Sequence, residues 1–179
     1  MDLRTALFEL IDMRSFSNLW FWIGLAVMWS SASHWVLGVP YDMIVKARRA
    51  RGEDAELAVA EMETLVHINV RRLLYIGRAS GLWLAGLTCF MLTGLGLLAF
   101  VYWVEFAQAV FLMSFPMTIV GLLSLNTARL IELDQGGAEQ IYKRLFRHRI
   151  IVQLVGMVSI FVTAMWGMYV NLAIGAIGV

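Results

Sequence analysis

The chain has 179 residues, of which 60% are hydrophobic and 15% charged. Soluble domains average about 45–50% apolar and about 25% charged residues, so this composition is typical of a membrane protein. A water-soluble domain of this size could not bury so much apolar surface. The net charge is +1, with 14 basic and 13 acidic residues. That balance gives no general attraction for nucleic acid, which is not an expected partner.

Four apolar segments are long enough to cross a bilayer. A spanning helix needs about 20 mostly apolar residues, and backbone groups in hydrocarbon must find their hydrogen-bond partners within the helix. None of the four segments contains Lys, Arg, Asp or Glu. We therefore predict an all-α membrane protein, a bundle of four transmembrane helices in a single membrane domain. The predicted spans are residues 18–39, 79–103, 106–126 and 150–174.

Three amphipathic or charged segments flank these spans. Residues 1–17 carry Leu3, Leu7 and Leu10 at helical spacing, which predicts a short helix lying in the membrane interface. In residues 40–78, apolar positions such as Met62 and Leu65 recur at helical spacing, so we expect a helical extension that runs into the second span. Residues 127–149 form the other long connection.

The basic residues are distributed asymmetrically. All but two of the 14 lie in residues 40–78 and 127–149. Cytoplasmic connections of membrane proteins are enriched in Lys and Arg, so both connections are predicted to be cytoplasmic and both termini to be on the opposite side.

Small residues recur at intervals of four in three of the predicted spans. Such ridges allow membrane helices to approach closely. They predict helix packing, either within the chain or against another protein. The ridge residues singled out are Ala26, Gly38, Gly77, Gly81, Ala85, Thr163, Gly167 and Asn171.

The three histidines, His34, His67 and His148, are all predicted near the cytoplasmic side. Converging imidazoles could ligate a metal ion or haem iron. Polar residues inside a membrane are functional candidates by default. A structural polar cluster around His34 is the alternative interpretation. The polar residues that accompany the histidines at this depth are Ser30, Ser31, Ser33, Asn126 and Arg129.

A basic stretch precedes the fourth span. It contains Lys143, Arg144, Arg147 and Arg149. Cations at this position interact with anionic headgroups, each contributing about 1 kcal/mol near the surface. An ordinary positive-inside anchor and a dedicated lipid site are both consistent with the pattern.

Two segments carry a resemblance to a known family. They are LIDMRSFSNLW at residues 10–20 and MWSSASHWVLGVPYD at residues 28–42. In these segments the chain resembles a family of small inner-membrane proteins of alphaproteobacteria, whose members often carry the label "component of SufBCD complex". The resemblance implies a bacterial inner-membrane location. The label would imply iron–sulfur assembly, but Cys89 is the single cysteine, and cluster ligation needs several thiolates.

No complete set of catalytic residues is present, so an enzyme is not expected. The leading hypothesis is a non-catalytic accessory or assembly subunit whose partners are the lipid bilayer and a larger membrane complex, or further copies of the chain. No cofactor is expected under that hypothesis. One alternative is a b-haem or metal-binding protein that uses His34, His67 or His148, and another is a small-solute channel or carrier.

The predicted orientation can be tested with topology reporters. A reporter fused after Val179 should be active only if it is of a periplasmic type, and one inserted after Gly137 only if it is of a cytoplasmic type, because cations hold the connections inside. A cytoplasmic C-terminus would contradict the orientation.

Overall fold

The computed structural model describes residues 15–133 and 137–177, and these residues are predominantly helical. Residues 1–14 of the predicted interfacial helix lie outside this described part. The elements, in chain order, are η1 (Ser15–Ser17), α2 (Leu19–His34), β1 (Trp35–Val36), β2 (Val39–Pro40), α3 (Tyr41–Arg49), α4 (Glu53–Phe100), α5 (Glu105–Leu133) and α6 (Ala138–Ile177).

Three helices, α4, α5 and α6, are long and apolar enough to cross a membrane. The predicted spans 79–103, 106–126 and 150–174 fall almost wholly within them. α2 has 16 residues, which extend over roughly 24 Å at a rise of about 1.5 Å per residue. This is shorter than the hydrocarbon core of about 30 Å. The helical fold class is therefore confirmed, whereas a fourth span is not.

The boundary predicted for the first span, residues 18–39, is wrong at its C-terminal end. α2 ends at His34, and β1 pairs with β2 in an antiparallel hairpin. Leu37 and Gly38, between the strands, have φ angles of 52° and 78°. Two-residue hairpin turns of the favoured type need positive φ at both central positions, which glycine adopts at little cost. The sequence signal for this early helix end is Gly38 followed two residues later by Pro40.

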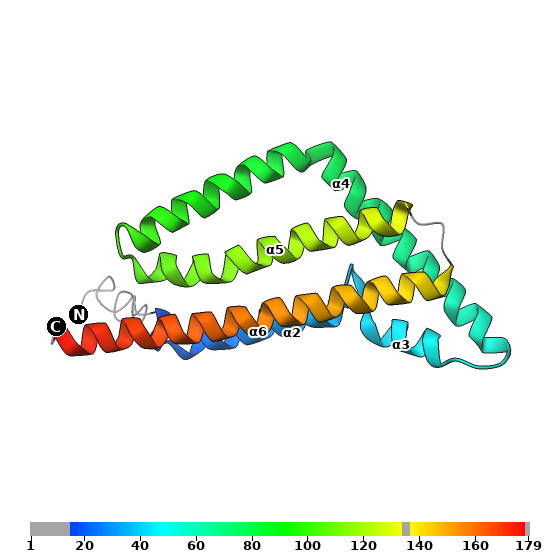
Figure 1. Cartoon of the computed structure of the whole chain (residues 1–179), viewed down its shortest axis with the longest axis horizontal. Helices are drawn as coiled ribbons and strands as arrows, with labels where there is room; N and C mark the ends of the chain where they lie inside the picture. The colour runs from blue at the N-terminus through cyan, green and yellow to red at the C-terminus, as the bar shows by residue number, and fades with distance from the viewer. Residues whose placement is uncertain (1–14, 134–136, 178–179) are drawn as a thin grey trace, which may run out of the picture.

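α4 is a single helix of 48 residues that joins the charged connection to the second apolar segment. The continuity expected from the sequence is confirmed, because no break separates the two parts. The helix bends near its middle (Figure 1). Gly77, Ser80 and Gly81 lie in this central region, and glycine and serine pairs are common sites of helix bending.

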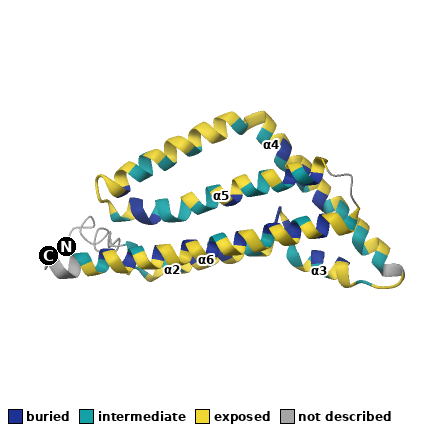
Figure 2. Cartoon of the chain, viewed as in Figure 1, coloured by how far each residue is buried: buried dark blue, intermediate teal, exposed yellow. Residues whose placement is uncertain are grey.

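The helices lie side by side in one elongated assembly, with α2 along α6 and α5 between α6 and the second half of α4 (Figure 1). Buried side chains gather where the first half of α4 crosses the ends of α5 and α6, whereas the second half of α4 is mostly exposed (Figure 2). A smaller cluster around Leu25 and Trp29 joins α2 to α5 and α6. Another around Phe16, Ala109 and Val170 closes the opposite end.

The contact between α2 and α6 depends on Gly156. A Cβ atom at this position would lie 2.8 Å from Cε3 of Trp29. Because the ring is buried, it has little room to move, and overpacked cores lose stability.

We expect Gly156→Ala to lower the free energy of unfolding by about 1–3 kcal/mol, measured by thermal unfolding in detergent. Gly121→Ala is the matched control, since nothing lies within 4 Å of that position, and the change favours helix by up to about 1 kcal/mol. The loss in free energy of unfolding caused by G156A should be smaller in a protein that also carries W29L, because the two positions are in contact. Equal effects of G156A and G121A would contradict this packing.

Candidate functional site

The largest buried region is a junction of five elements at the charged end of the molecule. The hairpin, α3, the first half of α4, the end of α5 and the start of α6 all contribute. On α4 the buried positions are Met62, Val66, Val70 and Leu74, each four residues from the next. The predicted stripe through Leu65 and Asn69 is only half-buried. The junction therefore positions the part of α4 that carries Asn69.

Asn69 links α4 to the hairpin. Its Nδ2 donates to the carbonyl oxygen of Gly38 at 3.4 Å and to that of Leu65 at 3.1 Å. A Cβ atom at Gly38 would lie 3.3 Å from Oδ1 of Asn69. Gly38 thus serves a tight turn against a neighbouring amide, rather than lying on a helix ridge as the sequence indicated.

His148 is a buried polar residue between α5 and α6. Its Nδ1 lies 3.1 Å from Oγ1 of Thr127, and its Nε2 lies 3.4 Å from Oγ of Ser124. Both hydroxyls donate to backbone carbonyls of α5, and a neutral imidazole carries one N–H, so one of the two hydroxyls accepts from the ring. His148 precedes the apolar run that begins at Ile150, and burial lowers its pKa from the ordinary 6.5. The ring is therefore neutral at pH 7 and holds the two helices together.

The other two histidines, His34 and His67, have other contacts and, among the residues described, are not bonded to His148. His34 is exposed at the end of α2 and forms an edge contact with Trp35. His67 is exposed on α4, with Nδ1 2.8 Å from the carbonyl oxygen of Glu63. Within the described residues, no group of three or more His, Cys, Asp and Glu side chains could hold a metal ion. The side chain of His34 contacts Trp35, that of His67 the backbone of Glu63, and that of His148 the hydroxyls of Ser124 and Thr127.

The predicted polar cluster around His34 does not form. Ser30 and Ser31 are exposed on α2, and Ser33 is half-buried. Asn126 and Arg129 are exposed on α5. No side-chain hydrogen bond joins these residues to His34 in the part of the chain that the structure describes.

The small-residue ridges of the different helices differ in whether they are buried against the rest of the chain. Ala26 on α2 is exposed, and the packing face of that helix is the one bearing Leu25 and Trp29. On α6, Thr163 is buried, Gly167 packs on Phe16, and Asn171 accepts a hydrogen bond of 2.9 Å from Oγ of Ser17. The α6 ridge faces the rest of the chain, whereas the α2 ridge faces outward.

The ridge on α4 divides at the bend. Gly77 approaches α5, where a Cβ atom would lie 3.2 Å from Cδ2 of Leu125. Nothing lies within 4 Å of the corresponding position at Gly81, and Ala85 is exposed. Only the first step of this ridge therefore packs within the chain.

The cations before the fourth apolar segment divide into two groups. The guanidinium carbon of Arg149 lies 3.4 Å from the centre of the Tyr41 ring, a cation–π contact that fastens α3 to α6. Nζ of Lys143 lies 3.6 Å from Oε1 of Glu139, one helical turn away. Arg144 and Arg147 line a cavity between α5 and α6.

Gln108 is an important buried group that sequence reasoning missed. Its Nε2 donates to the carbonyl oxygen of Ala99 at 2.9 Å, and its Oε1 accepts from Nε1 of Trp166 at 3.0 Å. This amide therefore ties α4, α5 and α6 together at the end away from the charged junction. The available signal was a glutamine inside an otherwise apolar segment.

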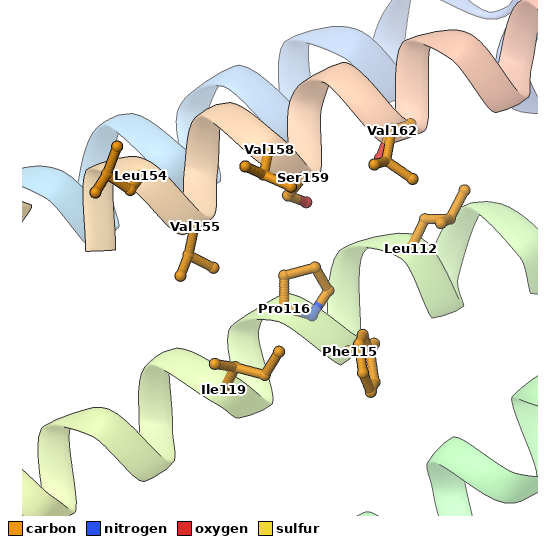
Figure 3. A pocket seen from close by; sticks show the side chains of 10 residues that line it. Leu112, Phe115, Pro116, Ile119, Leu154, Val155, Val158, Ser159 and Val162 are labelled. Atoms are coloured by element: carbon orange, nitrogen blue, oxygen red, sulfur yellow. The ribbon is translucent and has the colours of Figure 1, made fainter. Parts of the chain in front are cut away.

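An apolar cavity of about 390 Å³ lies between α5 and α6 beside Pro116 (Figure 3). Its walls are mainly aliphatic, and two buried hydroxyls, of Ser159 and Thr163, have no hydrogen-bond partner among the described residues. No charged side chain lines it. The cavity suits a hydrocarbon chain and offers no path for a charged solute.

Comparison of the chain with protein families, with curated proteins and with solved structures finds no match. The functional argument therefore depends on the geometry of the chain itself.

The buried neutral His148 makes a prediction about pH. Its pKa is lower in the folded state than the ordinary 6.5, so the unfolded state binds more protons as the pH falls through that value. Stability should therefore be full above pH 6.5 and fall below it. In thermal unfolding on both sides of this pH, His148→Gln should show a smaller acid-induced loss than the unaltered protein. The matched control is His67→Gln, an exposed site, and an H148Q profile identical to that of the unaltered protein would contradict the assignment.

Proposed function

We propose that the protein is a non-catalytic accessory or assembly subunit of a larger complex in a bacterial inner membrane. In this proposal α2 together with the adjoining η1 completes a fourth crossing, and both termini are periplasmic. The distribution of cations along the chain supports this orientation. The resemblance of residues 10–20 and 28–42 to alphaproteobacterial inner-membrane proteins supports the location.

The observation that carries the proposal is the exposure of the second half of α4. Only 6% of its most apolar stretch is buried by the rest of the chain, against 22% for α5 and 28% for α6. Leu82 and Trp83 are 88% and 84% exposed. Lipid chains and a protein helix are both apolar, so the hydrophobic effect does not favour one of them as the contact for this surface. The shape of the surface therefore decides which of them fits better.

The shape of this surface favours a protein helix. Gly81, Ala85, Cys89 and Thr93 follow one another at intervals of four along α4. The last three are exposed, and Gly81 has open space beside it. A flat stripe of small side chains lets a second backbone approach closely, which lipid chains do not exploit. The partner helix belongs to another subunit or to a further copy of this chain.

The alternatives receive less support. A b-haem or metal protein needs facing ligands, but the ring nitrogens of His148 lie against Thr127 and Ser124. A solute channel needs a polar path, but the cavity beside Pro116 has no charged wall. An absorption spectrum without a Soret band would remove the haem alternative, and vesicle flux equal to that of empty vesicles would remove the channel.

Purification from the native membrane in mild detergent tests the proposal. We expect the chain to recover a stoichiometric partner protein, or to elute as an oligomer. Gly81→Leu should reduce that association by tenfold or more, about 1.4 kcal/mol, because the larger side chain holds the partner helix away. The amount recovered per chain is the measurement.

Gly121→Leu is the matched control, since Gly121 on α5 also has open space beside it and lies off the stripe. A monodisperse single chain with no co-purifying protein would overturn the proposal. Equal losses from G81L and G121L would show that the stripe on α4 is not the contact surface.

A further inference from the structure

The cavity lined by Arg144 and Arg147 lies where the charged and apolar parts of the molecule meet. Its volume is about 250 Å³. On α5 it is lined by Leu123, Asn126, Thr127 and Leu130, and on α6 by Arg144, Arg147, His148 and Ile151. In each helix these positions follow the spacing of one helical face. The two faces therefore oppose each other across the cavity.

The cavity is polar at one end and apolar at the other. Ile151 is the second residue of the apolar segment of α6, and Leu123 lies within the apolar part of α5. Arg144 and Arg147 come from the charged start of α6. An anionic group joined to hydrocarbon is therefore complementary to this lining.

A second hollow adjoins the first on the same face of α6. It is lined by Gln140, Lys143, Arg144 and Arg147. The two hollows thus share both arginines. The second hollow extends the cationic surface away from the apolar segment, toward the side where a polar headgroup would project.

The donors around the cavity suit a phosphate group. The ion pairs found within the described residues, Arg78 with Glu132 and Lys143 with Glu139, do not involve Arg147, and Asn126 is exposed on α5. A planar guanidinium donates two parallel hydrogen bonds to phosphate oxygens, and a phosphodiester is the anion that membrane lipids provide at this depth. Basic pockets between membrane helices bind such headgroups.

We propose that this cavity is a binding site for the phosphodiester group of an anionic phospholipid. Arg144 and Arg147 hold the phosphate, the amide of Asn126 donates to one of its oxygens, and the acyl chain lies against Leu123 and Ile151. Arg149 takes no part, because its guanidinium lies on the ring of Tyr41.

Native mass spectrometry of the full chain in detergent tests the site, with added phosphatidylglycerol or phosphatidylcholine as the probe. We expect phosphatidylglycerol to be retained in preference to phosphatidylcholine. The variant R144Q/R147Q should bind phosphatidylglycerol roughly thirtyfold more weakly, since each cation contributes about one fivefold factor. R71Q/R72Q, which removes two exposed cations of α4 away from the cavity, should bind like the unaltered protein.

Two further measurements separate a lipid from a soluble phosphate. Ile151→Ala should weaken the binding of phosphatidylglycerol, and inorganic phosphate should displace the lipid poorly. Effective displacement by inorganic phosphate, with no effect of I151A, would overturn the lipid assignment. Equal losses from R144Q/R147Q and R71Q/R72Q would also overturn the site, because general surface charge would then explain the binding. If R144Q/R147Q fails to fold, R147Q alone should still weaken binding about fivefold.

Discussion

The structure depends on the requirement that backbone N–H and C=O groups in hydrocarbon find partners within the chain. A helix satisfies this requirement by itself, so the apolar segments of α4, α5 and α6 are unbroken helices. Among the described residues, a turn at residues 101–104 joins α4 to α5, and the hairpin at residues 35–40 lies at the charged end. There Asn69 bonds to the carbonyl oxygen of Gly38. Irregular backbone therefore lies between the helices, and at the hairpin a protein side chain satisfies one of its carbonyl groups.

The two ends of the molecule are held together by different forces. At the charged end, aliphatic side chains of five elements form a core like that of a soluble domain, because the hydrophobic effect acts where water is present. Within the apolar segments that force is absent, and specific contacts replace it. Gln108 bonds to α4 and α6, and Gly156 admits the ring of Trp29.

Two features of the surface are suited to binding other molecules. Little of the second half of α4 is buried by the rest of the chain, and among the described residues Ala85, Cys89 and Thr93 of its stripe are exposed. The cavity at Arg144 and Arg147 lies where the charged and apolar residues of α6 meet. The proposed contact with a partner helix rests on the exposed face of α4. The proposed lipid site rests on the basic cavity.

Three features could be read from the hydropathy and charge of the sequence: the three long apolar helices, the continuity of α4 and the clustering of cations. Each of them is a local property of consecutive residues. Spacing alone could not decide which face of a helix meets a neighbour. The ridge through Ala26 faces outward, whereas that through Gly167 packs on Phe16. Likewise, His148 differs from His34 only through what surrounds it. Its bonds to Ser124 and Thr127 exist because the tertiary structure brings α5 and α6 together.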